Sequence, residues 1–334
     1  MQNMHWQRCY DAYLRHLYDK SSSEHTVEAY RSILTHFFAF RHPEDATRAD
    51  VEYFLRQKLT SAPGYGDPPS AASRNQRLSI LSSFYRYAST YMIPGPDGRP
   101  RPLFRAASPT LGVTRAKVSR TPRAFTFDEL ERLFAVIPLD TERGLRDRAI
   151  YACLFWCARR KSEIANLLFG DLFHGVVQDS DGTKRDAILY RFRGKGGKVD
   201  IAEMPKAAYM AVMRYLSQSG RLATIADDDP LFVGVPVHPA IVHDPYKPIG
   251  GDTIWLNLRK YMRLAGLDAR RLNVHSLRHG SVRERYIAGE DIISLQHLLR
   301  HENISTTNVY LSQLVTPSDP GARLLEERFR NFEW

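Results

Sequence analysis

The stretch HSLRHGSVRERYIAGEDIISLQHLLRHENISTTNVY, which runs from His275 to Tyr310, determines how the rest of the chain is interpreted. Its apolar residues recur with the spacing of amphipathic helices. Histidines, arginines and a final tyrosine are interspersed among them, and such side chains suit contact with a phosphate. His275 and Arg278 are three residues apart, so a helix would place both on one face. An isolated His-x-x-Arg pair is usually a surface feature, and its meaning depends on what other segments supply.

The overall composition favours a soluble protein with a polyanionic partner. A length of 334 residues suggests two domains, and the net charge of +10 suits a nucleic acid. No run of about 18 apolar residues occurs, so we expect no membrane span. The three cysteines, Cys9, Cys153 and Cys157, make no disulfide framework in a chain this long. We expect a reducing cytoplasmic location, with Cys153 and Cys157 as buried thiols on one helix face rather than metal ligands.

Basic residues concentrate in one region of the first half. Between residues 68 and 123 there are ten basic residues and one acid, Asp97. A solvated basic face is the ordinary interpretation, but so one-sided a stretch favours a track for DNA phosphates. Its first part is a predicted helix whose arginines are expected to face outward. The candidate DNA-binding residues are Arg74, Arg77 and Arg86 on this helix, Arg115, Lys117 and Arg120 beyond it, and Lys198 in the second half.

Periodicity divides the chain into a helical first part and a mixed second part. Helical patterns cover residues 6–17, 21–41, 47–59 and 70–90, which predicts a small all-α domain. Residues 91–125 are rich in Pro, Gly and basic residues, and we interpret them as an interdomain linker. Further helices follow. Residues 187–205 are instead predicted to form two strands joined by a Gly-Lys-Gly-Gly-Lys turn.

Two upstream features could join the opening stretch in one site. Arg160 follows a buried helix, and an arginine there needs a partner, for which Glu163 has suitable spacing. The strand-connecting turn projects Lys195 and Lys198. Each feature has an ordinary structural interpretation when it is taken alone, and a tyrosine such as Tyr310 is by default a half-buried aromatic residue.

Taken in order, these residues resemble the tyrosine recombinases of the phage integrase family. The resemblance rests on Arg160, a lysine of the hairpin, His-Ser-Leu-Arg-His at 275–279, Leu-Leu-Arg-His at 298–301, and Tyr310. LLRHENISTTNVY is similar to the family's motif around the nucleophile, and ASRNQRLSILSSFYRYA resembles a helix of its core-binding domain. At 158–159 the chain has Ala-Arg where the family more often has Gly-Leu. Arg159 is therefore an alternative to Arg160 as the site arginine, and the register with Ser162-Glu163 favours Arg160.

The resemblance covers essentially the whole chain and implies its architecture. The expected fold is mainly α, with a helical core-binding (SAM-like) domain and an α+β catalytic domain that contains a small antiparallel sheet. The expected bounds are 1–104 for the first domain, 105–124 for a basic linker, 125–314 for the catalytic domain and 315–334 for a tail helix. The tail would dock on a neighbouring protomer or fold back on its own domain. No arm-binding domain fits before Trp6, which favours a simple Xer-like or Cre-like organisation.

The resemblance also implies a role for each site residue. Tyr310 would form a 3′-phosphotyrosyl bond, Arg160 and Arg278 would clamp the phosphate, and Lys195 would protonate the leaving oxygen. Lys198 remains an alternative to Lys195. His275 would act as acid and base, and His301 would donate to the scissile phosphate. Glu163 and His279 would support these residues.

The predicted activity is site-specific DNA recombination without a metal or other cofactor. A homotetramer would act on two double-stranded sites through a Holliday junction, with accessory DNA-binding proteins as potential partners, in the cytoplasm at the nucleoid. The alternatives are a type IB topoisomerase and a non-catalytic DNA-binding protein of the same fold.

Overall fold

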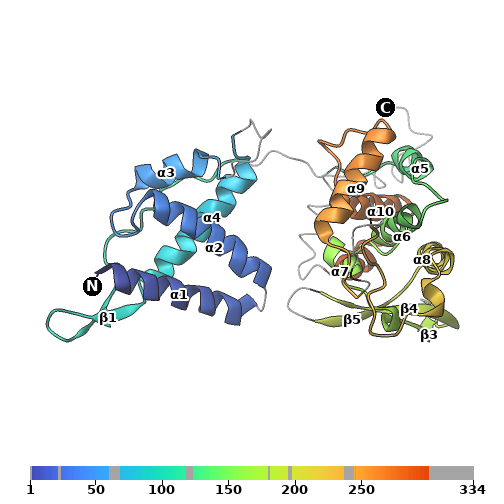
Figure 1. Ribbon diagram of the computed structural model, residues 1–334, viewed down its shortest axis with the longest axis horizontal. Helices are drawn as coiled ribbons and strands as arrows, with labels where there is room; N and C mark the ends of the chain where they lie inside the picture. Colours follow the sequence, from blue (N-terminus) through green and yellow to red (C-terminus); the bar gives the residue numbers. More distant parts are fainter. Residues whose placement is uncertain are drawn as a thin grey trace, which may run out of the picture. The chain divides into compact units, whose positions relative to one another are not determined.

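The computed structural model describes residues 2–21, 24–59, 68–117, 123–179, 181–194, 198–236, 244 and 246–300. The chain divides into two compact units, Met1–Arg120 and Thr121–Trp334, both shown in Figure 1. Each unit has its own hydrophobic core.

The described part of the N-terminal unit contains four helices. These are α1 (Gln2–Ser21), α2 (Glu24–Phe40), α3 (Arg48–Arg56) and α4 (Ala71–Ala88). α1, α2 and α3 all contact α4, so α4 lies at the centre of this unit. Their apolar faces enclose an aromatic core that includes Trp6, Tyr13, Phe37, Phe54, Phe84 and Tyr85. The four helices predicted from periodicity are confirmed.

Side-chain caps fix where two of these helices begin. The Thr47 side chain accepts a hydrogen bond from the main chain of Asp50, and the Asp50 carboxylate accepts one from the Thr47 N–H at 2.9 Å. Ser70 caps α4 through the N–H of Ser73. Such caps satisfy N–H groups that have no partner inside the helix.

The basic stretch after α4 makes definite contacts with the N-terminal unit. β1 (Met92–Pro94) and β2 (Pro100–Pro102) form an antiparallel hairpin. Beyond the hairpin, the Asn75 side chain exchanges two hydrogen bonds of 2.8 Å with the backbone of Ala116. Arg115 also donates to the Ser79 hydroxyl at 3.0 Å. This stretch, interpreted from the sequence as a linker, is therefore held against α4 through Arg115 and Ala116.

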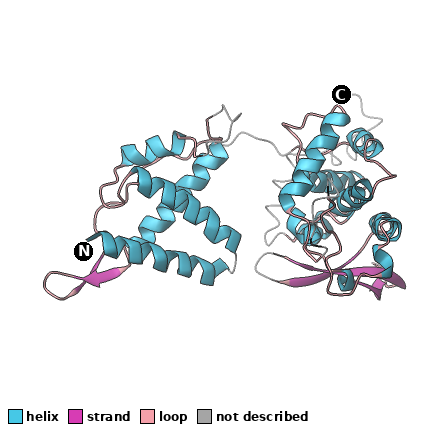
Figure 2. Cartoon of the chain, viewed as in Figure 1, coloured by secondary structure: helices cyan, strands magenta, loops and turns pink. Residues whose placement is uncertain are grey.

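Helices also dominate the C-terminal unit (Figure 2). They are α5 (Phe127–Ala135), α6 (Glu142–Trp156), α7 (Lys161–Ala165), α8 (Lys206–Gln218), α9 (Gly251–Leu264), α10 (Val274–Ile287) and α11 (Ile292–Leu299), with short 3-10 helices η1 (Phe169–Asp171) and η3 (Arg221–Ala223). α6 is buried along most of its length and packs against α8 and α10. Among the described residues, no helix is both long enough and apolar enough to cross a membrane.

A three-stranded antiparallel sheet completes this unit. Its order is β3-β4-β5, with β3 (Leu172–Gln178), β4 (Lys184–Arg193) and β5 (Val199–Glu203). β4 and β5 correspond to the two predicted strands, whereas β3 was not predicted. The LFHGVVQ sequence of β3 places His174 and Gly175 among its apolar residues, so it lacks a clear alternation. The predicted fold class, mainly α with a small antiparallel sheet in the second unit, is confirmed.

A buried ion pair on α6 is connected to α9 by hydrogen bonds. Arg146 Nη2 lies 2.6 Å from Asp147 Oδ1, and both side chains are 1% exposed. The second oxygen, Asp147 Oδ2, accepts hydrogen bonds from Asn257 at 3.0 Å and from the Tyr261 hydroxyl at 3.1 Å. Removal of one partner from such a network leaves an uncompensated buried charge.

We therefore expect Asp147→Ala to lower the free energy of unfolding of the C-terminal unit by about 3–5 kcal/mol. Asp140→Ala is the control, because Asp140 is exposed, and it should change stability by less than about 0.5 kcal/mol. Urea unfolding of the two variants measures the difference. Equal stabilities would contradict a structural role for the ion pair.

Candidate functional site

Arg160 stands at the start of α7, where Glu163 holds it. The Arg160 N–H donates to Glu163 Oε2, and Arg160 Nη1 donates to Glu163 Oε1, both at 2.8 Å. The Glu163 side chain is only 3% exposed, whereas that of Arg160 is 40% exposed. The buried carboxylate therefore fixes both the main chain and the side chain of Arg160 while part of the guanidinium reaches the surface.

Arg278 lies on α10 and is buried, with 2% of its surface exposed. Its Nη1 donates to the carbonyl oxygen of Ala158, and its Nη2 donates to that of Leu299, both at 2.6 Å. Ala158 precedes Arg160 by two residues, and Leu299 is the last residue of α11. One guanidinium thus joins α10 to the turn that carries Arg160 and to the end of α11.

The turn between α6 and α7 has a left-handed residue. Ala158 has a φ of 50°, a conformation that favours glycine, and the resemblance described above gives glycine as the more frequent residue here. A non-glycine residue in this region costs on the order of 1–3 kcal/mol unless its surroundings hold it. The hydrogen bond from Arg278 to the Ala158 carbonyl supplies such a restraint.

Two histidines occupy the beginning of α10. Asn273 caps this helix, and its Oδ1 accepts hydrogen bonds from the N–H groups of His275 and Ser276. The rings of His275 and His279 lie 4.8 Å apart in an edge-to-face arrangement. His275 is exposed, whereas His279 is buried. Burial lowers the pKa of His279 to about 3, and the nearby His275 and Arg278 contribute to the lowering. His279 is therefore a neutral group beside the arginine at ordinary pH.

Arg159, which the sequence left as a rival to Arg160, points into the protein. Its side chain is 3% exposed and donates hydrogen bonds to the Tyr190 hydroxyl and the Leu298 carbonyl. Arg159 therefore links β4 to α11 inside this unit. Sequence reasoning missed its role as an internal link, because both of its acceptors are distant in the sequence.

Of the two candidate hairpin lysines, the structure describes only Lys198. Lys198 is exposed, and its carbonyl closes the hairpin by accepting from Gly194 N–H at 2.8 Å. Four predicted site residues lie outside the described residues: Arg120, Lys195, His301 and Tyr310. The described residues that the structure brings together are Arg160, Glu163, Arg278, His275 and His279.

The described side chains assemble no metal site. No group of three or more His, Cys, Asp or Glu residues lies close together in this part of the chain. Cys153 and Cys157 are both buried in and just after α6, as predicted. The hydrogen bond between the two thiols and burial raise the pKa of Cys153, while the same hydrogen bond lowers the pKa of Cys157.

Arg77 does not face outward, contrary to the prediction for its helix. Only 9% of it is exposed, and Nη1 donates to the Gln57 carbonyl at 2.5 Å and, more weakly, to that of Phe54 at 3.4 Å. Arg77 therefore caps the end of α3. By contrast, Arg86 is exposed on the same helix.

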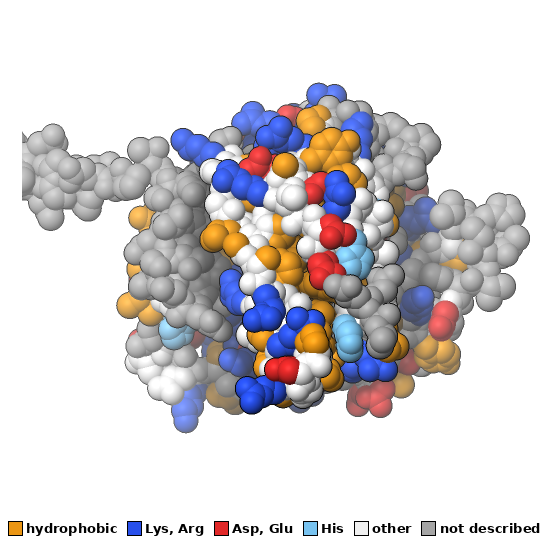
Figure 3. Space-filling view, turned by 90° about the vertical axis from the view of Figure 1, so that its left-hand side faces the viewer, with side chains coloured by type: hydrophobic (Ala, Val, Ile, Leu, Met, Phe, Trp, Pro, Cys, Tyr) orange, Lys and Arg blue, Asp and Glu red, His pale blue; other side chains and the backbone are white. Residues whose placement is uncertain are grey.

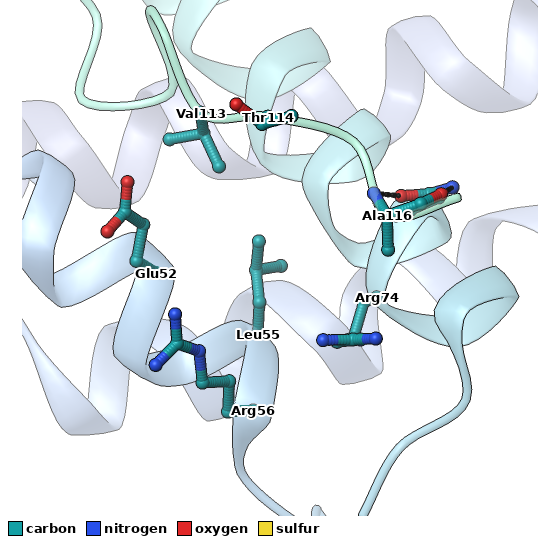
Figure 4. A pocket seen from close by; sticks show the side chains of 8 residues that line it. Glu52, Leu55, Arg56, Arg74, Val113, Thr114 and Ala116 are labelled. Carbon is teal, nitrogen blue, oxygen red and sulfur yellow. Dashed lines mark hydrogen bonds between the residues drawn. The ribbon is translucent and has the colours of Figure 1, made fainter. Parts of the chain in front are cut away.

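Arg74 lines a surface pocket between α3, α4 and residues 113–116 (Figure 4). Arg56 and Glu52 also line it, so the pocket carries both signs of charge. Arg115 and Lys117 are exposed. In the space-filling view of Figure 3, basic side chains on the visible face are interspersed with acidic and hydrophobic ones. The basic character of the N-terminal unit therefore does not form one uniform patch on that face.

Comparison with known proteins gives consistent matches. The model of the phage integrase family matches residues 123–315, and that of the phage integrase N-terminal SAM-like domain matches residues 10–90. Tyrosine recombinase XerC of Chromobacterium violaceum is 28% identical over 302 residues, which cover 89% of this chain and 87% of the relative. Tyrosine recombinase XerD of Xanthomonas axonopodis pv. citri is 28% identical over 244 residues, or 72% of each chain. The structure of a lambda integrase dimer bound to a COC′ core site has a TM-score of 0.61 at 16% identity, and the match covers 94% of this chain and 79% of that one.

The buried His279 predicts a pH dependence of stability. An unfolded histidine has a pKa near 6.5, so between pH 6.5 and 3 the unfolded state binds a proton that the folded state does not. Stability is therefore complete above pH 6.5 and falls as the pH falls below it.

We expect His279→Gln to reduce the loss of stability between pH 7 and pH 5, measured by urea unfolding. His174→Gln, at an exposed position on β3, is the matched control and should retain the wild-type pH dependence. An unchanged pH dependence in His279→Gln would show that His279 is not the buried neutral group.

Proposed function

The chain belongs to the phage integrase family and is a tyrosine recombinase, and on this premise we propose a role for each residue of its site. Its activity is site-specific DNA recombination, which requires that one enzyme cut a strand and rejoin it to another. A covalent protein–DNA intermediate serves this purpose, because it retains the energy of the broken phosphodiester bond.

The observation that carries the proposal is the position of Arg278. Its buried guanidinium is held against the segment before Arg160 and against the end of α11, from which the chain continues to His301. Arg160 is held in turn by Glu163. Two restrained guanidiniums supply fixed positive charge, and fixed donors stabilise the negative charge that develops on a phosphate during transfer.

In the proposed reaction, the Tyr310 oxygen attacks the scissile phosphorus and forms a 3′-phosphotyrosyl bond. The bond from phosphorus to the 5′ oxygen breaks at the same centre. His275 takes the phenolic proton, and Lys195 gives a proton to the departing 5′ oxygen. Arg160, Arg278 and His301 donate to the non-bridging oxygens, so that the arginines supply the charge that metal ions supply in other phosphoryl transfers. In the reverse step, a 5′-hydroxyl attacks and Tyr310 leaves.

We propose that the protein acts on double-stranded DNA sites as a homotetramer. A related protein, lambda integrase, has been solved as a tetramer bound to a Holliday junction. Four copies would bring two sites together and exchange strands through such a junction, with the tail at 315–334 docking on a neighbouring copy. Exposed Arg86, Arg115 and Lys117 would contact phosphates, and accessory proteins could assist at the site. This work would take place at the nucleoid in the cytoplasm.

The chemistry predicts a covalent adduct that depends on Tyr310. Cells expressing the wild-type protein are lysed in strong denaturant without crosslinker, and the DNA attached to the recovered protein is sequenced. We expect one recurrent sequence with the wild type and none with Tyr310→Phe. Attachment scattered over the genome would instead indicate topoisomerase-like activity, and attachment that persists in Tyr310→Phe would exclude this nucleophile.

The assignment of the general acid predicts different losses at the two hairpin lysines. Lys195→Ala should reduce cleavage by about 100- to 10,000-fold, because the leaving oxygen loses its proton donor. Lys198→Ala should change it much less. The same duplex with sulfur in place of the 5′ bridging oxygen should restore cleavage by Lys195→Ala, since a thiolate leaves without a proton. If the sulfur substitution restored cleavage by Lys198→Ala and not by Lys195→Ala, Lys198 would be the proton donor.

A further inference from the structure

Two arginines contact one buried aromatic ring beside the site. Phe192 lies on β4 and is fully buried. The guanidinium carbon of Arg159 is 4.1 Å from its ring centroid, and that of Arg300 is 4.9 Å from it. Cations near an aromatic ring are attracted by its quadrupole, most strongly when water is excluded. The ring therefore links the turn before α7 with Arg300, the residue that follows α11.

Arg159 also forms two hydrogen bonds in different directions. Nε donates to the Tyr190 hydroxyl on β4 at 2.6 Å, and Nη1 donates to the Leu298 carbonyl on α11 at 2.8 Å. The last carbonyls of a helix lack partners inside it and carry the negative end of its dipole. A buried cation at this position satisfies one of them and is electrostatically favourable.

Arg300 restrains, through its own side chain, the position that follows Leu299 at the end of α11. It follows the last residue of α11 as the C-cap and lies in the left-handed region, with a φ of 52°, which costs a non-glycine residue energy. Its side chain pairs with Asp200 on β5, the strand that follows the hairpin turn. Arg278 donates to the intervening carbonyl of Leu299. Three arginines therefore restrain residues 298, 299 and 300 in succession.

Stability alone does not account for an arginine at position 159. Burial of a guanidinium is costly, and among the described residues no carboxylate lies within ion-pair distance of it. Leucine, the residue more frequent here in the family by the resemblance described above, would fill apolar space without that cost. What the guanidinium adds is a directed link from β4 to the end of α11.

We propose that Arg159 is a positioning residue for recombination, which fixes the end of α11 against β4 and thereby sets the path of the chain that enters His301 and leads to Tyr310. Its effect is on the arrangement of reacting groups within the bound complex and not on DNA affinity. The inference rests on the proposed function, in which His301 and Tyr310 act on the phosphate.

The test uses the full-length protein and a nicked duplex that carries the sequence recovered from the wild-type cellular adduct. The short 5′-hydroxyl fragment diffuses away after cleavage, so covalent product accumulates. The rate of covalent attachment at saturating protein and the dissociation constant for the duplex are measured separately. Arg159→Leu is compared with Arg214→Leu, an exposed arginine on α8, and with Tyr310→Phe.

We expect Arg159→Leu to lower the saturated cleavage rate by about 10- to 100-fold, with DNA affinity and thermal midpoint close to those of Arg214→Leu. If this variant fails to fold, Arg159→Lys is tested in its place, because it keeps the charge and one of the two hydrogen bonds. If the folded variant cleaves at the wild-type rate at saturating protein while Tyr310→Phe is inactive, the inference is overturned and the proposed function is left intact. A variant whose only defect is a higher dissociation constant for the duplex would also overturn it. An adduct that persists in Tyr310→Phe would overturn the proposed function, and this inference with it.

Discussion

The site depends on a buried guanidinium that bonds to two carbonyl oxygens. Arg278 is almost inaccessible to water and donates to Ala158 and Leu299, which lie in segments far apart in the sequence. A buried cation that lost these acceptors would keep the full cost of its desolvation, so the two hydrogen bonds are obligatory. For that reason the left-handed turn at Ala158 and the end of α11 are fixed together. Arg160 follows the first segment, so the protein itself holds the two guanidiniums of the proposed site, those of Arg160 and Arg278, in fixed positions.

Much of this architecture could be predicted from periodicity and residue order. The four helices of the N-terminal unit bury continuous apolar faces, and β4 and β5 alternate on either side of a glycine-rich turn. In the site, the three-residue spacing of Arg160 and Glu163 predicted a contact that is present in the structure. Such features are local, because the partners are close in sequence and the spacing itself brings them together.

Features that depend on distant acceptors could not be predicted in this way. Arg77 belongs by spacing to a basic helix, but the carbonyl groups at the end of α3 lie within its reach and draw it inside. Arg159 is likewise drawn in by Tyr190 and the Leu298 carbonyl, neither of which its own sequence neighbourhood reveals. β3 was missed because His174 and Gly175 interrupt the alternation of apolar and polar residues. Its strand conformation is stabilised by pairing with β4, which its own sequence pattern does not predict. In each case, the deciding interaction is tertiary.

The most direct test of the account is to identify the amino acid that carries the DNA. The denatured adduct is digested with nuclease and trypsin, and the modified peptide is sequenced by mass spectrometry. Trypsin cuts after Arg300 and Arg323, and the peptide between them contains a single tyrosine, Tyr310. The account predicts a nucleotide remnant on that tyrosine. A remnant on any other residue would contradict it, because the proposed mechanism assigns the attack on the phosphate to Tyr310 alone.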